Sequence, residues 1–261
     1  MKIKAVKSEN AYILIILCAA ALSIFLYTYL PTSALFIFNS PDETANFFAT
    51  ESFNFYNSFG RPEPLNDIAG GLIHPRSIVA RGDYLLPVSF IGLPLIYGAL
   101  SKVTGLGLVP FFVPFFSSAI VVIFYFLIKR IFGADTAFWS ALFLVFLPPF
   151  LYFSNRGLFH NVLFLDLIIL FAAVMVFRPL GGLEKHAGNK KWIYRFGDEI
   201  WGGIILGLAF LTRPTEFLWL LPIILAAMFL FRDKISGKKL WVFFAVFAVF
   251  IFIFFFINKT L

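Results

Sequence analysis

The stretch YILIILCAAALSIFLYTYL, residues 12–30, decides the fold class, because it carries no charged residue along its whole length. An apolar helix of about 20 residues is what crosses the hydrocarbon core of a bilayer. Lys2, Lys4 and Lys7 precede it, as in a signal peptide. The stretch is longer than the apolar region of about 7–15 residues in a signal peptide, and no small-residue cleavage site ends it. We interpret it as an uncleaved first transmembrane helix.

The composition of the whole chain agrees with a membrane protein. Of its 261 residues, 61% are hydrophobic and 13% are charged, whereas soluble domains carry about 25% charged residues. The net charge of +7 does not indicate nucleic acid, because the basic residues lie in short loops between apolar runs, where they orient a protein in the bilayer. The single cysteine, Cys18, excludes an internal disulfide and a multi-cysteine metal site.

Hydropathy predicts an all-α polytopic membrane bundle of about seven transmembrane helices. The predicted spans are residues 12–30, 108–128, 136–153, 161–177, 200–211, 217–231 and 240–257. The run at residues 85–100 is also apolar, but two prolines and two glycines interrupt it. We expect this run to lie on the outer face as a partly sunk helix rather than to cross.

Loop charge gives the orientation. If residues 85–100 do not cross, the inner loops are 1–11, 129–135, 178–199 and 232–239, and these hold 14 of the 21 lysines and arginines. Positive charge is enriched in cytoplasmic loops. We therefore predict a cytoplasmic N-terminus and one membrane domain over residues 1–261, in which an extracytoplasmic segment, 31–107, carries juxtamembrane helices and six further spans follow in 108–257.

Two adjacent acids follow the first span, in the sequence NSPDETA at residues 39–45. Charges at a membrane edge are costly and often functional, so Asp42 and Glu43 are candidate site residues. A proline followed by two acids also makes a good first turn of a helix, because acids stabilise the positive end of the helix dipole. Both interpretations remain open from these residues alone.

The chain resembles the GT-C class of membrane glycosyltransferases, particularly its branch of protein O-mannosyltransferases and aminoarabinose transferases. Four segments, in the family's order, carry the resemblance: Ser40–Glu43 after the first span, His74-Pro75 followed by Gly92–Gly98, Leu147–Gly157, and Gly207–Thr215. Members of the class usually continue with further helices. The resemblance therefore implies that these residues correspond to the N-terminal seven-span module.

The resemblance also implies a reaction. A hexosyl or pentosyl group would move from a polyisoprenyl-phosphate donor to a hydroxyl of a protein, lipid or glycan acceptor, on the outer face of the plasma membrane. Asp42 matches the family's catalytic acid, so it is the expected general base, a role typically worth about 10²–10⁴-fold in rate. Glu43 would assist it or bind a metal.

The leaving phosphate suits arginine, whose guanidinium can bind two phosphate oxygens and stays charged. The outer candidates are Arg76, Arg81, Arg156 and Arg213. The alternative for Arg156 and Arg213 is that they only extend toward lipid headgroups from the ends of spans.

His74, His160 and Asn161 complete the candidate substrate-binding set. Either histidine, together with Asp42 or Glu43, is a donor set that suits a divalent cation. No short-spaced ligand motif supports a metal site, so we predict no metal ligand and leave a divalent cation as an alternative. Relatives often carry an acid near residues 156–161, where this chain has His160 and Asn161 instead.

Two other function classes remain as alternatives. One is a non-catalytic membrane subunit. The other is a lipid or solute transporter, whose usual sign is a pair of related halves with broken helices and polar groups at mid-membrane. No such internal repeat is evident, and the ionisable residues gather toward the outer face. A membrane glycosyltransferase with Asp42 as general base is therefore the favoured hypothesis.

Overall fold

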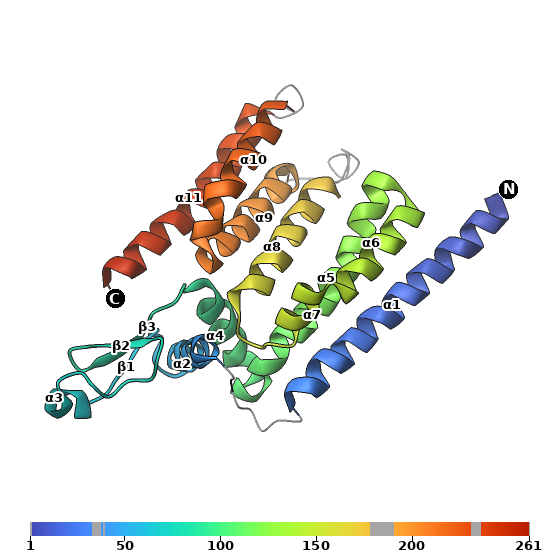
Figure 1. The fold of residues 1–261 in the computed structure, drawn as a ribbon. Coiled ribbons are helices and arrows are strands. Elements are labelled where there is room, and N and C mark those ends of the chain that lie inside the picture. The colour runs from blue at the N-terminus through green and yellow to red at the C-terminus, as the bar shows by residue number, and fades with distance from the viewer. Residues whose placement is uncertain (1, 33–37, 39, 178–190, 231–235, 261) are drawn as a thin grey trace. The chain divides into compact units, whose positions relative to one another are not determined.

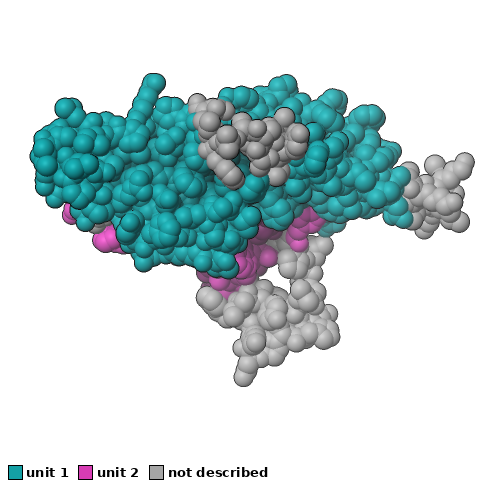
Figure 2. Space-filling model, turned by 90° about the horizontal axis from the view of Figure 1, so that it is seen from below, with its two compact units in different colours: residues 1–166 teal, residues 167–261 magenta. Residues whose placement is uncertain are grey.

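The computed structural model describes residues 2–32, 38, 40–177, 191–230 and 236–260. Its main elements are helices (Figure 1). The chain divides into two compact units, residues 1–166 and residues 167–261, which Figure 2 colours separately. Each unit is described by itself below. The prediction of one membrane domain stays a prediction, and most of the inner-loop charges in 178–199 and 232–239 lie outside the described residues.

The first unit contains three long helices that pack on one another: α1 (Lys2–Thr32), α5 (Val109–Phe132) and α6 (Ala134–Phe146). Residues 31–107, called the outer segment after the predicted topology, hold α2 (Pro41–Tyr56), α3 (Leu65–Ala69) and α4 (Gly92–Thr104), with α2 packed on α4, and the short η1 (Leu106–Leu108) follows. After α6 come α7 (Pro148–Ser154) and α8 (His160–Val176), which crosses the boundary between the units. The outer segment is therefore structured over most of its length.

Helix α2 begins where the sequence provides a helix start. The Ser40 hydroxyl accepts a hydrogen bond from the backbone N–H of Asp42 at 3.2 Å, and Pro41 occupies the first turn. A capping hydroxyl and a proline with a fixed φ both stabilise a helix N-terminus. The helix ends at Asn57, which adopts a left-handed conformation. The interpretation of Pro41 and the two acids as a helix start is thus confirmed.

The outer segment also contains a small antiparallel sheet, which the all-α prediction lacked. Strand β3 (Tyr84–Pro87) lies between β1 (Arg61–Pro62) and β2 (Ile78–Arg81). Ile78 and Leu85 pack against Ala45 and Phe48 of α2, which buries one face of the sheet. Strands of two to four residues are too short to display the alternation of apolar and polar residues by which a strand is recognised.

Prolines lie at two bends, one inside a predicted span and one between two predicted spans. Residues 136–153 form two helices, α6 and α7, bent by 58° where Pro148 and Pro149 follow Leu147. Proline disfavours helical geometry in the residue before it, and Leu147 is extended. In the second unit, Pro214 separates α9 (Lys191–Thr212) from η4 (Pro214–Glu216) and α10 (Phe217–Leu230), with a bend of 111°.

The second unit is held together mainly by the contact between α9 and α11 (Gly237–Thr260). Gly203 of α9 lies against the backbone of Phe243 and the side chain of Val246, and Gly207 lies under the ring of Phe250. Small residues allow two membrane helices to approach closely. A ring cluster of Phe210, Phe217, Phe247 and Phe254 fills the adjoining space.

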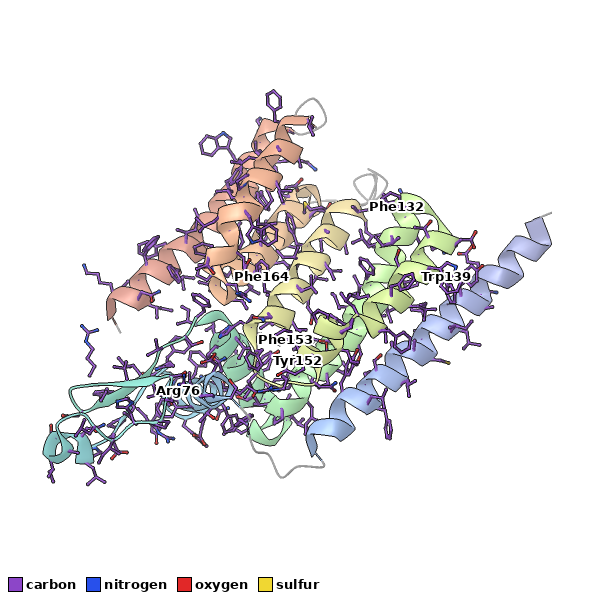
Figure 3. The ribbon with its side chains drawn as sticks, viewed as in Figure 1. Arg76, Phe132, Trp139, Tyr152, Phe153 and Phe164 are labelled. Carbon is purple, nitrogen blue, oxygen red and sulfur yellow. The ribbon has the colours of Figure 1, made fainter. Side chains whose placement is uncertain are left out.

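Several helices expose large apolar side chains on their surface. In Figure 3, Phe132 and Trp139 point outward from the first unit, and both are more than half exposed. A large exposed apolar surface marks a membrane or protein contact. By length and composition, α1, α5 with η1, and α11 can each cross a membrane, and the total rises to five if each bent pair is one span. The protein is a helical membrane protein, but the predicted number of seven spans is not confirmed, because α8 is shorter and three predicted spans fall in the two bent pairs.

The apolar run at residues 85–100 does not form a single helix. It is divided between β3 and α4, and α4 is not among the candidate spans. This agrees with the expectation that the run does not cross the membrane; its place at the outer face stays a prediction.

Candidate functional site

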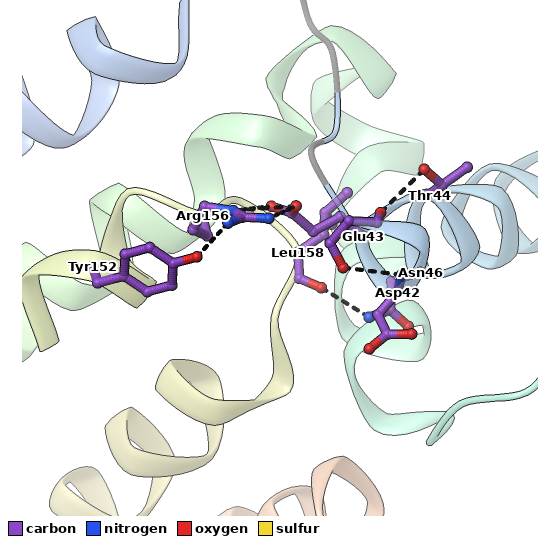
Figure 4. A network of polar contacts seen from close by, with 8 residues as sticks. Asp42, Glu43, Thr44, Asn46, Tyr152, Arg156 and Leu158 are labelled. Carbon is purple, nitrogen blue, oxygen red and sulfur yellow. Dashed lines mark hydrogen bonds and ion pairs between the residues drawn. The ribbon is translucent and has the colours of Figure 1, made fainter. Parts of the chain in front are cut away.

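The start of α2 is joined to the segment before α8 by an ion pair. Arg156 donates from Nε to both carboxylate oxygens of Glu43, at 3.1 and 3.2 Å, and from Nη2 to Oε2 at 2.5 Å. The Glu43 side chain is 4% exposed and that of Arg156 is 18% exposed. A buried carboxylate needs such a partner, because an unpaired charge in a low dielectric is very unfavourable. Figure 4 shows this network.

The other side of the Arg156 guanidinium contacts aromatic groups. Its Nη1 donates to the Tyr152 hydroxyl at 2.5 Å, and the rings of Tyr152 and Phe159 lie 5.4 and 5.1 Å from its central carbon. The hydrogen bonds to Glu43 raise the pKa of Arg156 above its ordinary value, although burial opposes this. Arg156 is therefore charged and committed to neighbours within the protein.

Asp42 lies next to Glu43 in the same helical turn but in a different environment. Its carboxylate is exposed, and Oδ1 accepts a hydrogen bond from the Ser77 hydroxyl at 2.7 Å. In Figure 4 it points away from Arg156. Ser77 has a φ of 65°, a left-handed conformation that is uncommon for a residue other than glycine. Such backbone strain often accompanies functional sites.

A second polar cluster lies one turn further along α2. Asn46 is fully buried, and its Nδ2 donates to the Leu158 carbonyl at 2.8 Å. A carbonyl can only accept a hydrogen bond, so it is the amide nitrogen of Asn46 that faces Leu158. The amide oxygen of Asn46 then faces His160 Nε2 at 3.1 Å. Because this oxygen can only accept, we assign the proton to Nε2 of His160. The Ser89 hydroxyl lies 2.8 Å from the same nitrogen.

This cluster includes residues that the sequence analysis missed. Asn46 was not singled out, although Glu43, Asn46 and Thr50 recur at helical spacing and are all buried. A polar stripe on one helix face was the signal that could have found it. Ser77 and Ser89 lie in irregular segments, where no periodic pattern distinguishes one serine from another.

Two predicted residues lie in the exposed part of the outer segment. Arg76 precedes Ser77, is exposed, and makes no hydrogen bond or ion pair with the part of the chain that the structure describes. It is labelled in Figure 3. His74 is also exposed, and its Nδ1 lies 3.1 Å from the Pro75 carbonyl. Arg76 is adjacent in sequence to Ser77, which contacts Asp42, and His74 lies three positions before Ser77.

The remaining predicted residues are divided between the units. Asn161 follows His160 in the first turn of α8. Arg213 belongs to the second unit, where its Nη2 pairs with Glu216 Oε1 at 2.8 Å, as the i,i+3 spacing predicts. Among the described residues, no three His, Cys, Asp or Glu side chains gather in a way that could hold a metal ion.

The comparison with known proteins gives the family. The profile of the dolichyl-phosphate-mannose-protein mannosyltransferases matches residues 94–257, which is more than half of the chain. The matched range contains Arg156, His160, Asn161 and Arg213, and it begins after Asp42. No curated protein and no solved structure matches the chain. The matched range thus includes α5–α10 and most of α11, and it indicates a membrane glycosyltransferase of the mannosyltransferase type. The chain belongs to the dolichyl-phosphate-mannose-protein mannosyltransferase family.

Proposed function

We propose that this protein transfers a sugar from a polyisoprenyl-phosphate donor to an acceptor hydroxyl, with Asp42 as the general base. The observation that carries the proposal is the difference between two neighbouring acids. Glu43 is buried and engaged by Arg156, whereas Asp42 is exposed, and its side-chain contact within the described residues is with the neutral Ser77 hydroxyl. A general base must be reachable by the proton that it accepts, and Asp42 is.

The reaction needs one proton transfer and one displacement. The acceptor oxygen forms a bond to the anomeric carbon of the sugar, and its proton passes to Asp42. The bond between the anomeric carbon and the donor phosphate breaks, and its electron pair stays on the phosphate oxygen. The products are a glycosylated acceptor and a polyisoprenyl phosphate.

A cationic side chain would stabilise the negative charge on the leaving phosphate. Arg76 is the best-supported candidate, because it is exposed, without a partner in the described part of the chain, and one residue from the contact of Asp42. Its guanidinium can bind phosphate oxygens in a bidentate manner. Arg156 is less available for this role, because Glu43 and Tyr152 already occupy its donors.

Of the two roles expected for Glu43, we assign it the assistance of Asp42. Together with Arg156 it fixes the first turn of α2, so both are positioning residues for Asp42. The buried cluster of Asn46 and His160 adds a second attachment of α2 to the segment before α8. These contacts support a rigid site, which matters because a displacement of about 1 Å can cost about 10²-fold in rate.

The proposed location follows from loop charge. We place the N-terminus in the cytoplasm and residues 31–107 on the outer side of a plasma membrane, since the other orientation would put most basic loops outside. The donor would then be used on the extracytoplasmic face. The family name supports a protein as one acceptor class.

The test uses membranes that contain wild type or Asp42→Asn protein in equal amounts, with a radiolabelled sugar on a polyprenyl phosphate. The variant keeps the shape of the side chain and removes the base. We expect transfer to fall at least about 10²-fold. Asp67→Asn is the matched control, because it makes the same change at another exposed acid of the outer segment. Equal transfer by wild type and Asp42→Asn would exclude Asp42 as the base.

A further inference from the structure

One buried acid of the first unit takes no part in the proposed reaction. Asp166 is the only aspartate, glutamate, lysine or arginine of α8, and it is 5% exposed. Ionisable groups inside membrane helices are costly to keep, and they commonly serve a function. The presence of a carboxyl group in this apolar helix therefore needs its own explanation.

The carboxylate of Asp166 has one weak contact within the described part of the chain. Its Oδ2 accepts a hydrogen bond from the Ser117 hydroxyl of α5 at 3.4 Å, which is long for such a bond. Its Oδ1 has no hydrogen-bond partner, and no basic side chain of the described residues pairs with it. A buried carboxylate without a partner is very unfavourable, so Asp166 requires a positive charge from elsewhere.

A second oxygen atom without a partner belongs to Tyr97 of α4. Tyr97 is fully buried, and its hydroxyl makes no hydrogen bond with the described residues. Its ring packs on that of Phe116, with the ring centroids 6.3 Å apart, and Phe116 precedes Ser117 in α5. Burial and then the charge of Asp166 raise the pKa of Tyr97 well above its ordinary value. Tyr97 is therefore a neutral phenol near enough to Asp166 to be affected by its charge.

Asp166, Ser117 and Tyr97 thus bring oxygen atoms together from α8, α5 and α4. Ser117 is fully buried as well. Carboxylate and hydroxyl oxygens are ligands of hard cations, whereas the nitrogen and sulfur ligands that transition metals favour are not part of this set. One carboxylate neutralises a monovalent cation, but it would leave a net buried charge beside a divalent one. The donor set therefore fits a monovalent alkali cation.

Two other ways to satisfy these oxygens explain less. A water molecule could donate hydrogen bonds to Asp166 and Tyr97, but it would not neutralise the carboxylate. A proton on Asp166 would neutralise it, and the resulting acid could then bond directly to the Tyr97 hydroxyl. The structure contains no hydrogen bond between these two side chains, which favours an ion between them.

We propose that Asp166, Ser117 and Tyr97 hold one monovalent alkali cation, such as sodium, in the interior of the first unit. Water molecules would complete its coordination. The cation would join α4 of the outer segment to the helices α5 and α8. None of the three side chains takes part in the proposed sugar transfer, so the site does not depend on that function.

The experiment measures the binding of sodium itself. The purified full chain in lipid nanodiscs is titrated with radioactive sodium, with N-methylglucamine as the other cation, and scintillation proximity gives the Kd. We expect saturable binding of one ion per chain. Asp166→Asn keeps the shape of the side chain and removes its charge, so it should abolish this binding. Tyr97→Phe and Ser117→Ala each remove one oxygen ligand and should raise the Kd about three- to tenfold.

The chain offers a matched control for each kind of change. Tyr125 is another fully buried tyrosine whose hydroxyl has no partner among the described residues, but the charges that act on it are those of Lys129 and Glu9. Tyr125→Phe should therefore leave the Kd within about twofold of wild type. Asp135→Asn makes the charge change at an exposed acid in the first turn of α6 and should leave sodium binding unchanged.

Thermal unfolding provides a second measurement. An ion that binds only the folded state raises the unfolding midpoint, so sodium at constant ionic strength should stabilise wild type and leave the midpoint of Asp166→Asn unchanged. If Asp166→Asn does not fold, the comparison of Tyr97→Phe with Tyr125→Phe decides the matter. The absence of saturable sodium binding in wild type would show that a proton neutralises Asp166 and would overturn the proposal. Sodium binding that persists in Asp166→Asn, or an equal Kd in Tyr97→Phe and Tyr125→Phe, would overturn it as well.

Discussion

Arg156 donates three hydrogen bonds to the carboxylate of Glu43, which lies 113 positions earlier in the chain. The contact attaches the first turn of α2 to the segment that leads into α8. Because successive helical residues point about 100° apart, holding Glu43 inward leaves Asp42 pointing outward. The division of roles between the two acids is thus a consequence of helix geometry and of one ion pair.

Arg156→Ala should destabilise the protein strongly. It leaves the buried carboxylate of Glu43 without its partner, and breaking a buried pair in this way typically costs about 3–5 kcal/mol. The free energy of unfolding, measured in detergent by a thermal or chemical transition, checks this. The double variant Glu43→Leu/Arg156→Met should recover much of the loss, because it leaves no unpaired charge.

Arg61→Ala is the matched control for that change. Arg61 pairs with Glu51 at 2.9 Å, but the two side chains are 41% and 30% exposed. Exposed pairs contribute about 0–1 kcal/mol, so this variant should change the stability little. An Arg156→Ala protein as stable as Arg61→Ala would refute the structural role of the Glu43 contact.

Two substitutions of Ser77 should separate the effect of backbone strain on stability from the effect of the hydrogen bond. Ser77→Ala removes the hydroxyl and keeps a side chain at a φ of 65°, so it should lose about 1 kcal/mol of stability. Ser77→Gly removes the same hydroxyl but relieves a left-handed conformation that costs roughly 1–2 kcal/mol, so its stability should equal or exceed that of wild type. Unfolding transitions of the two variants test the difference. Sugar transfer should fall in both if Ser77 orients Asp42; wild-type transfer in both would show that the contact has no catalytic role.

The helical character and the start of α2 were readable from the sequence. Long apolar runs gave α1, α5 and α11, and Pro41 with two acids gave the start of α2. The positions where helices break were harder to predict. A proline in a membrane helix is either tolerated or ends the helix, depending on whether neighbouring groups satisfy the freed backbone groups. Residues 136–153 were therefore predicted as one span, and they form two helices.

The candidate site was predictable only in part. The position of Asp42 and Glu43 after the first span marked them together, but their different environments depend on Arg156, a contact between distant positions. The sheet escaped prediction because its strands are very short. Ser77 has no signature at all, since its φ and its bond to Asp42 arise from the hairpin that follows it.

Gly203 should tolerate no side chain. A Cβ at this position would lie 3.0 Å from the Phe243 carbonyl oxygen and 2.9 Å from the Val246 Cβ, so α9 and α11 would have to separate. Overpacking of this kind costs about 1–3 kcal/mol, and the thermal midpoint of Gly203→Ala should fall. Gly197 lies in the same helix with nothing within 4 Å of its Cβ position. Gly197→Ala should therefore be neutral or raise stability by up to about 1 kcal/mol; equal losses in both would contradict close packing at Gly203.

The tip of the outer segment should become more stable in acid. A hydrogen bond and the charge of Asp83 raise the pKa of Asp67 above its ordinary value of 3.8. A carboxyl whose pKa is raised by folding holds its proton more tightly in the folded state. Its stabilising contribution is complete at pH below that ordinary value and is lost as pH rises through the higher, folded pKa. Hydrogen exchange of the α3 amides should therefore show greater protection in acid, after correction for intrinsic exchange rates. Asp67→Asn should abolish this dependence, since an amide donates to Asp83 at every pH. Dependence that persists in the variant would assign the titration to another group.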